Sequence, residues 1–144
     1  GPRMLELAAA KSKGAIPYSV TPDYTAKARE ILGPEAWLCV EQKVCLTNIE
    51  SEARNVARKQ MGRYLRWPNY LNNWMRMGFN EADLEGHGSS KFLDAMVCWG
   101  SEKRIMSYLE EHFSSGADHV VVQALQPDGM EGTDFSVLQA LAPK

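Results

Sequence analysis

The sequence predicts an α/β fold in which parallel strands alternate with helices, as in part of a (β/α) barrel. Two short apolar runs, 15–20 and 37–46, each precede a helix signal, and a third run, 120–125, follows a long helical region. Strands separated by helices pair in parallel through right-handed crossovers. A closed barrel needs eight strands and usually about 200 or more residues. With 144 residues and about three strand signals, we expect this chain to form only part of such a barrel.

The first third of the chain contains two strand–helix units preceded by a helix. Residues 2–10 favour a helix because Ala, Leu and Met propagate it. The run 15–20 predicts a buried strand. Thr21 and Pro22 then provide an N-cap and a first helical residue, and the helix ends at Gly33. The second strand, 37–46, is apolar without strict alternation, which indicates that both of its faces are covered.

Four helices are predicted between the second strand and the last one. Thr47 and Glu50 have the spacing of a capping box, and the helix that follows ends before Pro68. Its polar face carries five basic residues and is interpreted as a solvated surface. The other helix signals cover 70–77, 92–97 and 102–113, with a polar stretch at 80–90 and a final helix at 133–141.

Composition excludes several classes of function. Sixteen Lys and Arg against 18 Asp and Glu give a net charge of −2, so we expect neither nucleic acid nor a membrane surface as a partner. The absence of a long apolar run and of a signal-peptide pattern predicts a cytoplasmic protein. The three cysteines have no metal-binding or disulfide spacing, and His87, His112 and His119 share no ligand spacing, so no metal is expected.

Parallel α/β folds bind ligands at the carboxyl ends of their strands. The segments to inspect are therefore Tyr18–Pro22, Leu46–Asn48 and Gln123–Pro127, together with Gly1-Pro2-Arg3-Met4 before the first helix. The backbone N–H groups and positive dipole end of that helix suit a phosphate. Every helix has such an end, and Gly-Pro is also a common remnant of cleaved tags.

Short motifs follow one another in a specific order over about residues 1–125. The main ones are Gly1-Pro2-Arg3-Met4-Leu5, Gly14-Ala15-Ile16-Pro17-Tyr18, Leu32-Gly33-Pro34, Pro68-Asn69-Tyr70, Asp94-Ala95-Met96-Val97-Cys98-Trp99-Gly100 and Gly116-Ala117-Asp118-His119-Val120. In this order and spacing the chain resembles the second half of the luciferase-like flavin or deazaflavin oxidoreductases. The resemblance is greatest to the actinobacterial subgroup that uses coenzyme F420.

The resemblance implies the carboxyl-terminal half of a (β/α)8 TIM barrel that transfers a hydride between a bound deazaflavin and an organic substrate. It places the cofactor phosphate against Gly1, Pro2, Arg3 and Met4, with Arg3 as a charge partner. F420 is the implied cofactor, and FMN, as in a luciferase-like monooxygenase, is the alternative. Family members are roughly twice as long. The usual catalytic residues would lie in the other half, so none is assigned here.

These expectations describe a single domain, 1–144, made of first βα units (1–47), a helical segment (48–116) and a last strand and helix (117–144). Such a half is expected to be inactive alone and to need a partner, either a homodimer or a missing amino-terminal half. Two alternatives remain open. The helices between Asn48 and Phe113 would form a non-catalytic interaction module, or a complete small enzyme would have its site around Tyr18, Thr21 and Gln123.

Overall fold

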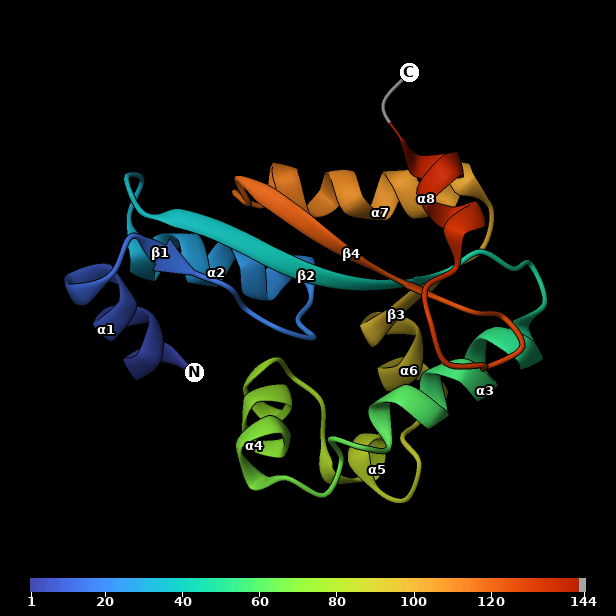
Figure 1. Ribbon diagram of the computed structural model, residues 1–144. Helices are drawn as coiled ribbons and strands as arrows, with labels where there is room; N and C mark the ends of the chain where they lie inside the picture. Colours follow the sequence, from blue (N-terminus) through green and yellow to red (C-terminus); the bar gives the residue numbers. More distant parts are fainter. Residues whose placement is uncertain (143–144) are drawn as a thin grey trace.

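The computed structural model describes residues 1–142 and contains a four-stranded parallel sheet flanked by helices (Figure 1). In chain order the elements are α1 (Pro2–Lys11), β1 (Gly14–Ala15), α2 (Pro22–Leu32), β2 (Trp37–Cys45), α3 (Glu50–Met61), α4 (Pro68–Arg76), α5 (Glu81–Leu84), α6 (Ser90–Met96), β3 (Val97–Trp99), α7 (Glu102–Ser114), β4 (His119–Leu125) and α8 (Phe135–Leu141). The expected α/β class with parallel strands is confirmed.

Strand β2 is the centre of the sheet. One edge pairs with β4 over the whole register from Cys39–His119 to Cys45–Leu125. The other edge pairs with β1 at its start and with β3 at its end, and a Tyr18–Glu41 bridge lies between them. All pairs are parallel, so the carboxyl ends of the strands meet at one edge of the sheet.

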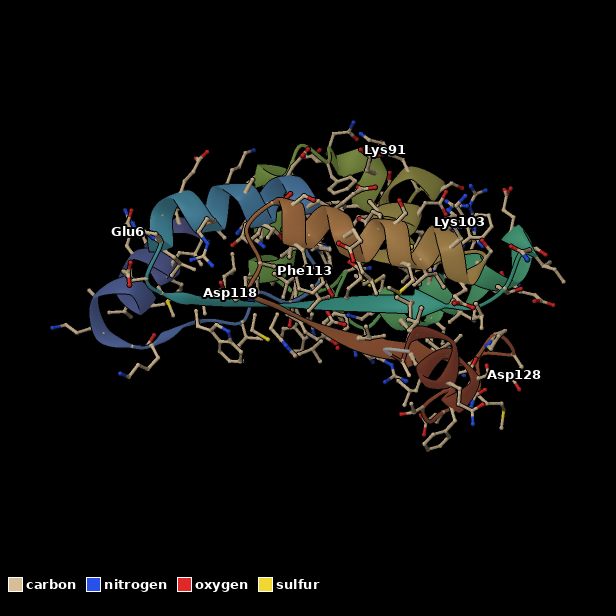
Figure 2. All side chains as sticks on the ribbon, turned by 90° about the horizontal axis from the view of Figure 1, so that it is seen from above. Glu6, Lys91, Lys103, Phe113, Asp118 and Asp128 are labelled. Atoms are coloured by element: carbon tan, nitrogen blue, oxygen red, sulfur yellow. The ribbon has the colours of Figure 1, made fainter. Side chains whose placement is uncertain are left out.

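One face of the sheet is covered by α2 and α7, which lie along β2 and β4 in Figure 2. Leu38 and Val40 pack with residues of α2, and Val44 packs with Ile105 and Leu109 of α7. This face also holds a buried polar chain. His112 contacts the Thr25 hydroxyl through Nδ1 at 2.9 Å and the Gln42 side chain through Nε2 at 3.1 Å, so both ring nitrogens of this buried histidine have partners within the fold.

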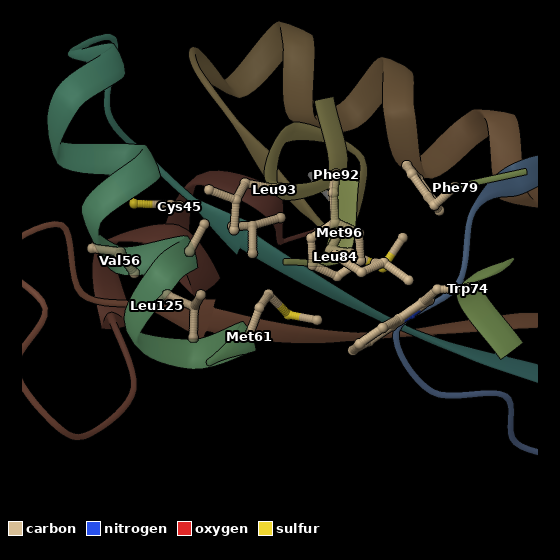
Figure 3. Close-up of a cluster of buried hydrophobic side chains, with 12 residues drawn as sticks. Cys45, Val56, Met61, Trp74, Phe79, Leu84, Phe92, Leu93, Met96 and Leu125 are labelled. Atoms are coloured by element: carbon tan, nitrogen blue, oxygen red, sulfur yellow. The ribbon is translucent and has the colours of Figure 1, made fainter. Parts of the chain in front are cut away.

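The largest apolar cluster lies where the ends of β2 and β4 meet the helical segment (Figure 3). Cys45 and Leu125, the last residues of β2 and β4, are strand residues against which the helices pack. The Phe92 ring on α6 is fully buried and makes edge contacts with Trp74 at 4.7 Å and with Phe79 at 5.3 Å between ring centroids. This cluster holds the four helices α3, α4, α5 and α6 against the sheet. It also fixes the position of α4 below the strand ends.

The other face of the sheet is open at its amino-terminal end. Trp37 and Val121 lie on this face, with 52% and 43% of their surface exposed, and the Trp37 ring lies 5.9 Å from the His119 ring. Side chains on a strand alternate between faces, so Glu41 and Lys43 point to the same side, where they are buried further along the strand. The exposed apolar surface of this face is therefore confined to its amino-terminal end, around Trp37 and Val121.

Several details differ from the sequence predictions. The helix expected to continue up to Pro68 ends at Met61, and turns follow it. The strand expected at 15–20 ends at Ala15, because Pro17 cannot donate to the ladder and Ser19 has a left-handed backbone. The capping box at Thr47 and Glu50 is wrong: Ile49 is the N-cap of α3, and the Thr47 hydroxyl donates to Glu52 instead.

Two short elements were also missed. A four-residue helix, α5, interrupts the polar stretch 80–90, and the helix expected to extend over 92–97 ends at Met96, where β3 begins. The sheet therefore has four strands rather than about three. Within residues 1–142, no helix has the length and apolar character needed to cross a membrane.

Candidate functional site

The carboxyl ends of the strands bring together side chains that are distant in the sequence. The Tyr18 hydroxyl donates to Gln123 Oε1 at 3.2 Å and lies 3.1 Å from the Tyr64 hydroxyl. Tyr18 and Gln123 were two of the three residues proposed from the sequence for a site in a small enzyme, and the structure joins them. The third, Thr21, serves instead as the N-cap of α2 and accepts a hydrogen bond from the Tyr24 amide.

A buried ion pair lies directly behind Tyr18. Lys43 Nζ is 3.0 and 3.1 Å from the two carboxylate oxygens of Glu41, and it donates to the Ser19 hydroxyl at 2.8 Å. The Lys43 side chain is fully buried and that of Glu41 is 7% exposed. The same ammonium lies 3.8 Å from the centroid of the Tyr18 ring, which is within the range of a cation–π contact. The ion pair therefore packs behind the two tyrosine rings, Tyr18 and Tyr64, that line the strand ends.

Burial determines the protonation behaviour of this cluster. It lowers the pKa of the Lys43 ammonium, and the adjacent Glu41 carboxylate acts in the opposite direction. Burial, followed by the hydrogen bond with Tyr64, raises the pKa of the Tyr18 phenol. Tyr18 therefore stays protonated at neutral pH, and it offers a ligand a hydrogen-bonding hydroxyl rather than a basic phenolate.

Ser19 is held in a rare backbone conformation by this cluster. Its φ of 53° lies in the left-handed region, where a non-glycine residue costs on the order of 1–3 kcal/mol. Three contacts stabilise it: its amide donates to Glu41 Oε2 at 3.1 Å, its carbonyl accepts from Trp74 Nε1 at 3.0 Å, and its hydroxyl accepts from Lys43. The turn after β1 is thus fixed by β2 and α4, which is a tertiary arrangement without a local sequence signal.

A pocket of about 370 Å³ opens beside Gln123 at the end of β4. Gln60 and Arg63 of the region around α3 form one wall, and the 126–133 loop forms the other. Its volume falls in the range of about 300–1,000 Å³ that is usual for ligand sites, and it occupies the edge of the sheet where parallel folds bind ligands. The pocket and the Tyr18–Tyr64 pair meet at Gln123, which lines the pocket and accepts a hydrogen bond from the Tyr18 hydroxyl.

The residues proposed for phosphate binding lie at the exposed start of α1. Gly1 is the N-cap, and its carbonyl accepts the Met4 and Leu5 amides. A Cβ atom on Gly1 would come within 3.2 Å of an Arg76 guanidinium nitrogen, so α4 delivers a cation to this helix end. Figure 1 shows the amino terminus directed towards α4. Sequence reasoning missed Arg76, because nothing near it in the chain links it to Gly1.

Other sequence candidates contribute less to the site. Leu46 packs into the apolar cluster around α7, and Thr47 organises the start of α3. Among residues 1–142 the structure has no grouping of three or more His, Cys, Asp or Glu side chains that could hold a metal ion. The Glu41–Lys43 pair was also missed, although two charges spaced by two in an apolar strand are a signal for a buried polar feature on one face.

Comparison with known proteins gives a match by structure only. No protein-family model matches the chain, and no curated protein matches it by sequence. The coenzyme F420-dependent tetrahydromethanopterin reductase from Methanopyrus kandleri aligns over 98% of this chain, with a TM-score of 0.68 and 14% identity. The chain shares its fold with F420-dependent enzymes. An F420-dependent secondary alcohol dehydrogenase aligns over 99% of the chain, with a TM-score of 0.60 and 11% identity.

The chain spans about half the length of these two structures, since the alignments cover 46% and 47% of them. Strands, helices and their order therefore correspond to one half of a TIM-barrel-like enzyme. This confirms the expected partial barrel as the fold class.

Proposed function

We propose that this chain is the carboxyl-terminal half of a luciferase-like oxidoreductase that uses coenzyme F420 to transfer a hydride to or from an organic substrate. The observation that carries the proposal is the fold match over nearly the whole chain to two F420-dependent enzymes. Fold alone does not define function. The position of the candidate site, at the carboxyl edge of the parallel strands, supplies the second support.

The start of α1 has the features that a cofactor phosphate requires. Gly1 has no Cβ and so lets the Arg76 guanidinium lie against this helix end, and the Arg3 amide belongs to the first-turn donors that have no partner inside the helix. Pro2 contributes no N–H, so the remaining attraction comes from charge. Arg3 and Arg76 are both exposed at this end. We assign Gly1, Pro2, Arg3 and Met4 to the phosphate, with Arg76 as a further charge partner.

The cluster at the strand ends would form one wall of the ring and substrate space. F420, when bound, supplies the hydride chemistry. In this chain Tyr18 and Tyr64 orient a ligand through their hydroxyls, Gln123 fixes the Tyr18 hydroxyl, and the buried Lys43–Glu41 pair keeps the wall rigid. Catalytic acid or base groups belong to the half that is not in this chain, so the isolated chain is inactive in this proposal.

The same proposal accounts for the open sheet face. Residues 1–47 supply the first βα units, 48–116 form the helical segment, which also contributes β3 to the sheet and α7 to the helices that cover it, and 117–144 supply the last strand and helix, all within one domain. The exposed Trp37 and Val121 surface would then be covered by an amino-terminal half or, in its absence, by a second copy.

Titration of the purified chain with F420, followed by the absorbance and fluorescence of the deazaflavin, tests this function. We expect saturable binding that is roughly 10-fold weaker in Arg76→Gln, because hydrogen bonds to a charged group contribute about 1.5–3 kcal/mol. Arg66→Gln, which removes the same charge from another exposed position, is the matched control. An FMN titration decides between the two cofactors. An unchanged F420 signal throughout the titration would contradict cofactor binding by this chain.

One observation favours the alternative of an interaction module. A pocket of about 560 Å³ between α4 and α5 is lined mainly by apolar side chains, including Leu65, Leu71, Met75 and Leu84. In that reading the helical segment presents a partner-binding surface and no cofactor binds. The F420 titration separates the two proposals, because only the oxidoreductase half predicts a cofactor signal that depends on Arg76.

A further inference from the structure

Arg63 lines the pocket beside Gln123 without a close hydrogen-bonding partner for its guanidinium group among its charged neighbours. Its Nη2 atom lies 3.7 Å from Glu131 Oε1, which exceeds hydrogen-bonding distance. The two side chains are 52% and 86% exposed. Ion pairs this open to solvent contribute little to stability. The Arg63 guanidinium in this pocket is therefore available to form hydrogen bonds with a ligand.

Glu131 belongs to a segment that is fixed at its base rather than at its tip. The Leu125–Thr133 bridge closes the 126–133 loop, and Gln126 Nε2 donates to the Thr133 carbonyl at 3.2 Å. Gly129 and Gly132, which flank the tip, have φ angles of 74° and 112°, a region that glycine enters without strain. Glu131 thus lies at the exposed tip of the loop, and its carboxylate is held near Arg63 by few contacts.

Arg63 is the only cation among the described residues that line this pocket, and two charged groups next to it, Lys59 and Asp128, already have partners. Lys59 Nζ donates to the Gly129 carbonyl, and the Asp128 carboxylate accepts the Met130 amide at 2.9 Å. Arg63 is therefore the cation of this wall that is available to a ligand. Its planar fork favours a carboxylate or a phosphate, which it binds through two parallel hydrogen bonds.

We propose that this pocket is an anion subsite, in which a carboxylate or phosphate group of the substrate replaces Glu131 on Arg63. The far end of such a ligand would reach Gln123, whose carbonyl oxygen is tied to the Tyr18 hydroxyl at 3.2 Å. The assignment of the ligand as a substrate rests on the proposed oxidoreductase function. It narrows the organic substrate to a small compound with one anionic end.

An NMR titration of the ¹⁵N-labelled chain with acetate, and separately with inorganic phosphate, tests the subsite without any cofactor. We expect shifts in the amides of Gly129 to Gly132 that saturate. Binding should weaken at least 10-fold in Arg63→Gln and tighten several-fold in Glu131→Gln, because that change removes the internal competitor. Arg66→Gln, also exposed but outside the pocket lining, should match the wild type. Equal weakening in Arg63→Gln and Arg66→Gln, or no effect of either Arg63 or Glu131, would overturn the proposal.

The same titration in the presence of F420 distinguishes the two sources of an anionic group. Acetate shifts that persist with the cofactor bound support a substrate subsite, whereas displacement of acetate by F420 would overturn it in favour of a cofactor contact. Acetate binding at Arg63 without any F420 binding would leave the anion site in place and contradict the proposed oxidoreductase function. The two failures are therefore separable.

Discussion

Replacing Lys43 by methionine should destabilise the fold more than any surface charge change. The substitution preserves most of the side-chain volume but leaves the Glu41 carboxylate, which is 7% exposed, without its cation. Removing one partner of a buried pair costs about 3–5 kcal/mol. The free energy of unfolding of a domain is about 5–15 kcal/mol, so the loss would be a large fraction of the total.

Urea denaturation, followed by tryptophan fluorescence and circular dichroism, measures this loss. The control is Lys91→Met. Its ammonium is on a side chain that is 65% exposed, and the buried Asp83 carboxylate keeps hydrogen bonds from the Ser89 hydroxyl and the Asn80 amide, so the pair should contribute only about 0.2–1 kcal/mol. Glu41→Gln combined with Lys43→Met removes both charges and should recover part of the loss. The reasoning is refuted if Lys43→Met costs no more than Lys91→Met, or if the two substitutions at 41 and 43 simply add.

Three further predictions concern other parts of the molecule. Burial lowers the pKa of His112 from 6.5 to about 4, so the unfolded chain takes up this proton before the folded chain does as the pH falls. Roughly 3 kcal/mol of stability is therefore lost between pH 6.5 and pH 4. Urea denaturation at several pH values should show that this part of the loss is missing in His112→Asn. Phe92→Ala should cost about 3–5 kcal/mol in the same assay, because the ring is fully buried, whereas Met75→Ala at a 41% exposed site should change stability by less than about 1 kcal/mol. Val121→Glu on the open sheet face should reduce self-association, measured by size exclusion with light scattering, and Ile49→Glu at the exposed N-cap of α3 should not. A wild-type chain that is monomeric at all concentrations would contradict the self-association.

The elements with local signals could be predicted from the sequence. Thr21 and Pro22 do form the cap and first residue of α2, and Ser101 caps α7 through a hydrogen bond from the Arg104 amide. Strand β2 was visible as an apolar run because both of its faces are covered over most of its length. In each case the physical cause lies within a few residues of the element.

The missed features depend on contacts between distant segments. Val97–Trp99 forms a strand because the end of β2 offers it a free edge, although its composition continues a helix. The left-handed backbone of Ser19 needs Glu41 and Trp74, and the cation beside Gly1 comes from Arg76. Half of the candidate site was therefore foreseen from strand ends, at Tyr18 and Gln123, while the charges around them required the three-dimensional structure.

The central position of β2 constrains the order in which the molecule can assemble. Its full-length partner, β4, begins 80 residues later in the paired register, from Cys39 to His119, so the longest ladder closes only after most of the chain exists. Closing a large loop has an entropic cost before any contact compensates for it, and folds dominated by distant strand pairs reach the native state slowly. During synthesis, the backbone N–H and C=O groups on one edge of β2 therefore lack their strand partners until the segment 119–125 has left the ribosome.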